Sequence, residues 1–260
     1  MQLHRGPGHL RVMKAWFVLG LFLVAQAARA AQPAAEFDTS GRYQQCAAMT
    51  KTDAQGAYNQ ALAWHSAGGG ASAEHCGALA LVQLGRYSEA APQLDRLAQR
   101  LDLKAALRAQ LYDQEGNAWL LAQDAERAAA AFTNALALVP QDVDTLADRA
   151  RARAMRKDWT GAERDLSSAL GLDGNRADLL VLRASARHAG GKLAEARADI
   201  ERALQVYPDY GDALVERGAM RFEDGDVKGA DADWRMVVKL APRSRAAALA
   251  NEYLSQTGAQ

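Results

Sequence analysis

The chain has few of the residues that build stapled or strand-rich proteins, and these scarcities exclude several classes. Its 260 residues include 2 cysteines, 6 prolines and 7% aromatic residues. Two cysteines exclude a disulfide-dense scaffold and a four-cysteine zinc site. The scarcity of proline, together with many alanines, favours helices over strands.

The chain also lacks an excess of charge of either sign. Its 31 basic and 31 acidic side chains balance, whereas proteins that neutralise nucleic-acid phosphates carry a clustered positive excess. A nucleic-acid partner is therefore not expected. Hydrophobic residues make up 49% of the chain, too large a share for a wholly disordered protein, and the length suits one large or two small globular domains.

The N-terminal apolar run is too short to cross a bilayer. It extends from Ala15 to Ala25, follows Lys14 and precedes the small-residue pattern Ala28-Arg29-Ala30. A basic start, an apolar core of about eleven residues and an A-x-A end are typical of a secretory signal peptide. We predict that residues 1–30 are a signal peptide and that no stable membrane span remains after cleavage. The alternative is an uncleaved N-terminal anchor.

The predicted signal peptide places the mature chain in the periplasm or outside the cell. Met13 is an alternative start to Met1, since Met13 and Lys14 alone supply the basic region. Residues 31–39 are expected to be a flexible lead-in. An oxidising compartment gives Cys46 and Cys76 the opportunity to form a disulfide. The alternative is two small buried thiols that never meet.

Internal repetition is the strongest signal in the sequence. Small residues, alanines, large apolar residues and helix-ending residues each recur at steps of 34 residues. In that order they are Gly116, Ala150, Ala184 and Gly218; Ala128, Ala162, Ala196 and Ala230; Phe132, Leu166, Ile200 and Trp234; and Pro140, Gly174, Pro208 and Pro242. Within each unit apolar residues follow three- and four-residue steps, as one helix face requires. The pattern predicts helical hairpins, which stack because one hairpin cannot bury its apolar face alone.

This pattern resembles the tetratricopeptide repeat family. The resemblance implies an all-α fold, a right-handed α-solenoid of helix-turn-helix repeats. Repeat units are expected at 109–142, 143–176, 177–210 and 211–243, with a divergent unit at 71–108, a degenerate hairpin at 40–70 and a capping helix and tail at 244–260. The chain departs from the family where Gly174 replaces the terminal proline. It also departs where Arg153, Arg187 and Arg221 stand at a position that is often aromatic, which only Trp119 keeps.

Two segments are expected to interrupt the regular spacing. Ala90 and Ala128 are 38 residues apart, so the connection near 101–104 is expected to hold about four extra residues. The glycines at 68–70 are expected to close the 40–70 hairpin, because three successive glycines are too flexible to be helical.

Charged residues also keep the repeat step. Arg149, Arg183 and Arg217 share one phase of the first helix, and Asp165, Asp199 and Asp233 share one phase of the second. The 109–142 unit lacks both, having Glu115 and Ala131. This joint presence and absence predicts a ladder in which each Asp pairs with the Arg of its own or the next hairpin. The alternative is a row of arginines that binds an anionic ligand.

No motif for catalysis, a cofactor or a metal is present. The sequence has no P-loop, G-x-G-x-x-G, G-x-S-x-G or H-E-x-x-H pattern. His75 stands beside Cys76, but no further residues complete a metal-ligand spacing. We therefore expect a protein that is not an enzyme and holds no cofactor or metal.

The resemblance implies that a protein or peptide partner binds the concave surface formed by the first helices. The corresponding residues are Asp113, Asn117, Leu120, Arg151, Val181, Ser185, His188 and Phe222. Only Asn117 fits the clamp with which some family members hold a terminal carboxylate, so that mode is not expected. Leu120 and Phe222 are either apolar anchors or core residues.

The sequence thus predicts an exported, non-enzymatic scaffold for protein–protein interaction in a bacterial-type cell envelope. One alternative is an assembly factor or chaperone-like module for an envelope complex, which would expose a larger apolar groove. A small-ligand-binding protein would instead need a closed pocket with convergent polar groups near His75 or His188.

Overall fold

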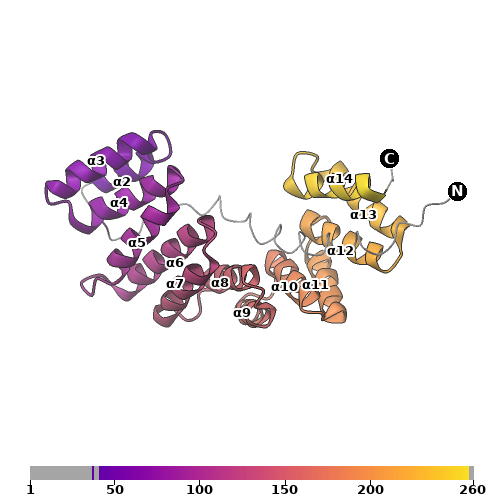
Figure 1. Cartoon of the computed structure of the whole chain (residues 1–260). Coiled ribbons are helices and arrows are strands. Elements are labelled where there is room, and N and C mark those ends of the chain that lie inside the picture. The colour runs from indigo at the N-terminus through magenta and orange to yellow at the C-terminus, as the bar shows by residue number, and fades with distance from the viewer. Residues whose placement is uncertain (1–36, 38–40, 258–260) are drawn as a thin grey trace. The chain divides into compact units, whose positions relative to one another are not determined.

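The computed structural model describes Phe37 and residues 41–257 of the chain. The predicted signal peptide 1–30 and the lead-in 31–39, apart from Phe37, lie outside the described residues. Every regular element in the described part is an α-helix (Figure 1). The predicted all-α solenoid of helical hairpins is confirmed. The chain divides into two units, with the boundary between Lys157 and Asp158.

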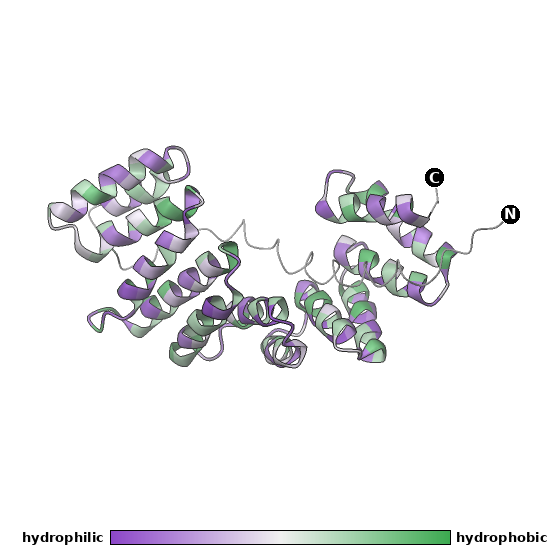
Figure 2. Cartoon of the chain, viewed as in Figure 1, coloured by the Kyte–Doolittle hydropathy of each residue, from purple (hydrophilic) through white to green (hydrophobic). Residues whose placement is uncertain are grey.

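Each unit is a series of helices in which every helix packs on the next. The N-terminal unit contains α2 (Arg42–Met49), α3 (Ala54–Ser66), α4 (Gly70–Gln83), α5 (Tyr87–Ala98), α6 (Ala105–Leu121), α7 (Ala125–Leu138) and α8 (Val143–Met155). The C-terminal unit contains α9 (Trp159–Leu172), α10 (Ala177–Ala189), α11 (Leu193–Val206), α12 (Gly211–Glu223), α13 (Val227–Leu240) and α14 (Arg245–Thr257). We call α2, α4, α6, α8, α10, α12 and α14 the first helices and the others the second helices. Along every helix polar and apolar residues are interleaved (Figure 2), and the apolar ones form the core.

Aspartates begin most of the second helices. The carboxylates of Asp124, Asp158 and Asp226 each accept a hydrogen bond from the backbone N–H three residues later. They therefore satisfy one of the donors that a helix leaves free at its N-terminus. The equivalent position before α11 is Lys192, whose side chain makes no such bond. These caps keep the 34-residue step and fix where each second helix starts.

The turn inside most of the hairpins has one residue in the left-handed region. Gly85, Gly191 and Gly225 occupy it with φ of 73°, 82° and 85°. At Gly191 the chain closes with bonds from Gly191 N to His188 O and from Lys192 N to Arg187 O, the Schellman arrangement that ends many helices. Gln123 and Lys157 hold the same position with φ of 62° and 61°. Within each unit the hairpin helices then pack on each other, α4 on α5 and α6 on α7, and α10 on α11 and α12 on α13.

Two expectations about irregular segments are corrected. Gly70 was expected to lie outside the helices, but it is the first residue of α4. Three residues, 67–69, separate it from the end of α3, and the positive φ values of Gly68 and Gly70 turn the chain over this short distance. The four extra residues near 101–104 lengthen the helix more than the connection. Helix α6 has 17 residues where α8, α10 and α12 have 13, and it begins at Ala105, before the predicted boundary at 109.

Candidate interaction surface

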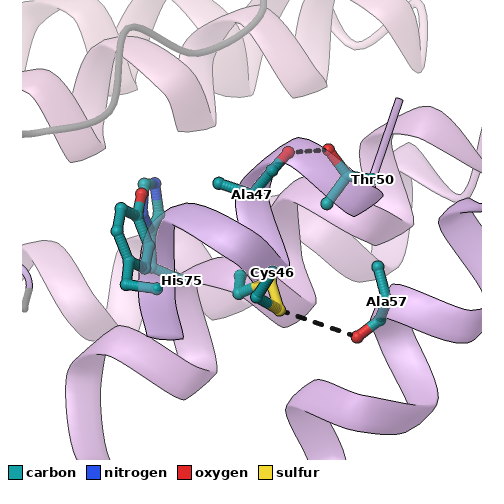
Figure 3. Close-up of a disulfide and its surroundings, with 7 residues drawn as sticks. Cys46, Ala47, Thr50, Ala57 and His75 are labelled. Atoms are coloured by element: carbon teal, nitrogen blue, oxygen red, sulfur yellow. Dashed lines mark hydrogen bonds between the residues drawn. A yellow bond between two sulfur atoms is a disulfide. The ribbon is translucent and has the colours of Figure 1, made fainter. Parts of the chain in front are cut away.

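Cys46 and Cys76 form a disulfide that joins α2 to α4. Their Cα atoms are 6.1 Å apart and both residues are fully buried. The Cys46 sulfur lies 3.9 Å from the carbonyl oxygen of Ala57 on α3 (Figure 3). A disulfide sulfur carries no proton, so this is a packing contact. The short helix α2 is therefore fastened covalently to the first helix of the next hairpin.

His75 lies beside this disulfide (Figure 3) and is completely buried. Its Nδ1 is 2.7 Å from the Tyr43 hydroxyl, its Nε2 is 2.6 Å from Gln114 Oε1, and its ring stacks on Phe37. A neutral ring with its proton on Nε2 satisfies both bonds, the hydroxyl donating to Nδ1. Burial lowers the pKa of His75 to about 4, against the hydrogen bond with Gln114. Both ring nitrogens are engaged within the chain, so neither is left for a ligand.

The arginine and aspartate rows meet within the hairpins of the C-terminal unit. Arg183 donates two hydrogen bonds, of 2.7 and 2.9 Å, to the carboxylate of Asp199, and Arg217 does the same to Asp233 at 2.7 and 3.0 Å. These two aspartates are 3% and 5% exposed. Arg149 and Asp165 belong to different units, and Arg149 donates to Thr133 of α7. The arginine heads of α10 and α12 are thus engaged by carboxylates of the chain itself.

A second arginine completes each of these contacts. Arg187 and Arg221, one turn further along the first helix, donate to the same aspartates at 2.7 and 2.8 Å. Two guanidinium groups therefore hold one buried carboxylate. These arginines stand at the usually aromatic position in the sequence, but their contact with the aspartate row was not predicted. Their common 34-residue step was the available signal.

In the hairpin formed by α6 and α7, other residues make the contacts at the positions of the two arginines and the aspartate. Trp119 stands in place of the second arginine, and its Nε1 donates to Glu115 Oε1 at 3.0 Å. The Arg127 guanidinium lies 3.5 Å from the centre of the indole ring, within the range of a cation–π contact. Burial raises the pKa of Glu115 to about 7, opposed by the Trp119 hydrogen bond. At three equivalent positions this hairpin therefore has Glu115, Trp119 and Ala131, where the 177–210 unit has Arg183, Arg187 and Asp199.

Polar residues predicted for partner binding instead join α6 to α8. Thr145 donates to Asp113 Oδ1 at 3.0 Å, and the Asn117 amide donates to Asp148 Oδ2 at 3.3 Å. Arg151 forms an ion pair with Asp148, and both are buried. These bonds connect successive first helices within the N-terminal unit.

The corresponding contact in the C-terminal unit is between α10 and α12. The Ser185 hydroxyl donates to Glu216 Oε1 at 2.7 Å, and His188 Nε2 lies 3.0 Å from Glu223 Oε2. Glu216 is fully buried. Ser185 and His188, like Asp113 and Asn117, thus contact the next first helix of their own unit.

Four of the eight residues predicted to contact a partner are instead buried within the chain, which corrects the prediction for them. Leu120, Val181 and Ser185 are each 1% exposed and Arg151 is 7% exposed, so the chain itself covers them. Leu120 lies on α6, which packs on α8, and Val181 and Ser185 lie on α10, which packs on α12. Arg151 is held in its buried ion pair with Asp148. Asp113, Asn117, His188 and Phe222 remain half-buried at the surface. The Phe222 ring also lies 6.0 Å from that of Trp234, which ties it to the core.

The exposed large hydrophobic residues lie elsewhere. In the part of the chain that the structure describes, they belong to second helices or connections. They are Leu62, Leu101, Leu172, Leu193, Tyr207, Val227, Met236 and Leu240. The half-buried residues of the first helices include the polar side chains of Asp113, Asn117, His188 and Glu223 and the apolar ring of Phe222.

The residues that the structure describes contain neither a candidate metal site nor a candidate membrane-spanning helix. Among these residues no group of three or more His, Cys, Asp or Glu side chains is placed to hold a metal ion. Within the same ranges, 37 and 41–257, no helix combines the length and the apolar character that a membrane crossing requires.

Solved structures share the fold. The chain is similar to MamA residues 41 to the end from Desulfovibrio magneticus RS-1, with TM-score 0.58 and 19% identity over 67% of this chain and 97% of that one. It is also similar to a MamA RS-1 double mutant (TM-score 0.57, 19% identity, 65% and 93% covered) and to another MamA crystal structure (0.55, 13%, 62% and 92%). No family model and no curated protein matches the chain. At these identities the likeness establishes the fold alone, a solenoid of helical hairpins.

Proposed function

We propose that this solenoid of tetratricopeptide-type hairpins is a non-enzymatic scaffold of the cell envelope that binds a polypeptide partner on its first helices. The observation that carries the proposal is the chemistry of those helices. Their ionisable side chains are engaged in contacts between helices, and the half-buried residues that remain offer polar groups to a partner. Such a surface supplies binding contacts and no assembled set of reacting groups.

The exported location is supported by the disulfide. Cys46 and Cys76 are the two cysteines of the chain, and they are bonded to each other and buried. Disulfides persist in secreted and periplasmic proteins and are rare in the cytosol. The signal-peptide pattern in residues 1–30 agrees with this location.

The placement of exposed apolar residues favours the scaffold over the chaperone-like alternative. A chaperone-like module would present apolar side chains along its first helices. In the described residues the exposed large hydrophobic side chains belong to second helices and connections. The partner is therefore expected to be held by polar contacts. It is expected to be a folded protein or one particular segment of a protein, in contrast to the apolar segments of unfolded chains that a chaperone binds.

The function is tested by site-specific cross-linking in cells of the source organism. A photoreactive amino acid is placed at Asn117 or His188 on the first helices, and at Leu62 or Met236 on the second helices as matched controls. We expect one polypeptide to be captured from the first-helix positions alone. Equal capture from all four positions would contradict the proposed surface.

The location is tested separately by thiol alkylation of the protein recovered from the envelope fraction. We expect Cys46 and Cys76 to resist a maleimide in denaturant until a reductant is added. Immediate modification of both thiols, with the protein in the cytosolic fraction, would contradict export without bearing on the cross-linking result.

A further inference from the structure

The two hairpins α10–α11 and α12–α13 are joined by different chemistry on their two sides. On the second-helix side Arg197 pairs with Asp224, with Nη2 and Oδ1 2.8 Å apart, and Arg217 lies 3.9 Å from Glu201. A guanidinium keeps its charge at every pH at which proteins fold. On the first-helix side the contacts are Ser185–Glu216 and His188–Glu223. The first of these contacts includes the carboxyl group of Glu216, whose charge changes with pH.

The surroundings of Glu216 disfavour the ionised form of its side chain. Its side chain is fully buried; Ser185 donates to Oε1, whereas Oε2 has no hydrogen-bond partner. Asp212 and Glu223 flank it on α12, and both act on it as like charges. Burial, with these two acids adding to it and the Ser185 hydrogen bond opposing it, raises the pKa of Glu216 to about 8. Glu216 therefore carries a proton at neutral pH.

The other helices packed against α12 offer Glu216 no compensating cation. Helix α10 presents Ser185 and His188, and the His188 imidazole is already paired with Glu223. Helix α14 presents the Tyr253 hydroxyl, and its Arg245 acts on Asp212. Among the charged groups of α11 and α13, Arg197, Glu201 and Asp233 contact Asp224, Arg217 and Arg221 on the second-helix side.

We propose that the contact between α10 and α12 is a pH-sensitive hinge, in which deprotonation of Glu216 opens the first-helix side while the second-helix side stays closed. A buried carboxylate with an unpartnered oxygen is costly, and separation of α10 from α12 gives it water. Opening this side as pH rises also separates His188 from Glu223. The guanidinium pairs on the other side are unaffected over the same range. The inference concerns the isolated chain and does not depend on the proposed partner.

Hydrogen exchange with mass spectrometry tests the hinge in the full chain between pH 6.5 and 9, after correction for the intrinsic pH dependence of exchange. We expect peptides from α10 and α12 to lose about tenfold in protection for each pH unit above the midpoint. Peptides from α11 and α13 are expected to keep their protection. Uniform loss across α9–α14 would overturn the proposal.

Three variants assign the effect to Glu216. Glu216→Gln keeps the shape without the charge, so we expect protection to persist to pH 9. Glu195→Gln, at an exposed glutamate on α11, is the matched control and should retain the wild-type midpoint. Ser185→Ala removes a hydrogen bond that favours the ionised form, so the midpoint should move to higher pH and gives a second test if Glu216→Gln folds poorly. A wild-type midpoint in Glu216→Gln, or an unmoved or lower midpoint in Ser185→Ala, would overturn the hinge.

Discussion

At the residue scale, the side chain on a second helix limits the size of the residue that faces it on the first helix. A Cβ at Gly116 would lie 2.6 Å from the ring of Phe132, and one at Gly218 would overlap the Trp234 indole, with Cδ1 at 2.8 Å. In the 177–210 unit the second helix carries Ile200, and Ala184 occupies the glycine position. Glycine is therefore required where the opposing residue is aromatic.

Gly218→Ala is expected to lower the free energy of unfolding by about 1–3 kcal/mol, because the added methyl group overpacks the core against Trp234. The matched control is Gly171→Ala on α9, where a Cβ would have open space. That change should raise stability by about 0.5–1 kcal/mol through helix propensity. Denaturant unfolding checks both, and a stabilising effect at both positions would show that packing at Gly218 is not limiting.

The buried carboxylate shared by two arginines gives a second prediction. Asp199→Asn removes the charge that holds Arg183 and Arg187, and we expect a loss of about 2–4 kcal/mol because the largely buried Arg183 loses its counter-ion and Arg187 keeps only Glu163. Glu89→Gln is the control, since the Glu89–Arg86 pair is exposed and is expected to contribute little to stability. Similar losses for both variants in chemical denaturation would contradict a special role for burial.

The raised pKa of Glu115 predicts a pH-dependent stability. In the folded chain the pKa is about 7, above the ordinary value of a glutamate, so the favourable contribution is complete in acid and is lost as pH rises through 7. Glu115→Gln keeps an acceptor for Trp119 and carries no charge. Its stability relative to wild type should therefore increase from pH 5 to pH 8, by on the order of 1–3 kcal/mol.

Glu163→Gln provides a control of opposite sign for this experiment. Burial acts to raise the pKa of Glu163, but hydrogen bonds from Lys192 and Arg187 outweigh it and the net pKa is lowered. Its contribution is present above the ordinary glutamate pKa and is lost as pH falls below it. The variant should be less stable than wild type at pH 8 and approach it in acid. Parallel pH profiles for the two variants would contradict the assignment.

At the scale of the helix, α11 differs from the other regular second helices at its first turn. Lys192 has φ −91° and ψ 66°, close to the −79° and 71° of Asp158 and the −78° and 68° of Asp226. The backbone before α11 is therefore already shaped for an aspartate cap, and only the side chain is missing.

Lys192→Asp is expected to stabilise the protein by about 0.5–1 kcal/mol, because the new carboxylate accepts from the free N–H of Glu195. The change also removes the exposed contact between Lys192 and Glu163, and Lys192→Ala measures that loss alone. Thermal unfolding of the two variants gives the value of the cap as their difference. A Lys192→Asp variant no more stable than Lys192→Ala would mean that the helix start does not limit stability.

At the scale of the whole molecule, stability in a stack of hairpins is local, because each hairpin contacts its neighbours along the chain. The disulfide acts on one end of the N-terminal unit. It closes a loop of about thirty residues between α2 and α4, which corresponds to about 3–4 kcal/mol by loop-closure entropy.

The double variant Cys46→Ala, Cys76→Ala should therefore lose hydrogen-exchange protection in α2, α3 and α4, while α9–α14 keep theirs. Wild-type protein treated with a reductant in mild denaturant should behave in the same way, and the variant should not respond to the reductant. Loss of protection throughout the C-terminal unit would show that the two units unfold together.

Much of the architecture could be predicted from the sequence. Gly116 and Phe132, like Gly218 and Trp234, were recognisable as a small and a large residue in fixed phase, and that phase alone requires a helical hairpin. The row of arginines that includes Arg183 and the row of aspartates that includes Asp199 were recognisable because the 109–142 unit lacks both. These features are local patterns, and a pattern that repeats every 34 residues reports on the same local geometry each time.

Other features could not be predicted because they depend on how successive hairpins pack. The phase of Leu120, Val181 and Ser185 was correct for a first-helix surface, but phase does not give the depth to which the next helix covers a residue. The sequence left the pairing of Cys46 with Cys76 open, since bonding requires two specific Cα atoms to approach within about 7 Å. The burial of Glu216 likewise arises where α10 meets α12. Sequence by itself determined the repeating hairpin, which short-range periodicity encodes; the tertiary structure decided which of its polar residues face solvent, because that depends on contacts between residues thirty or more positions apart.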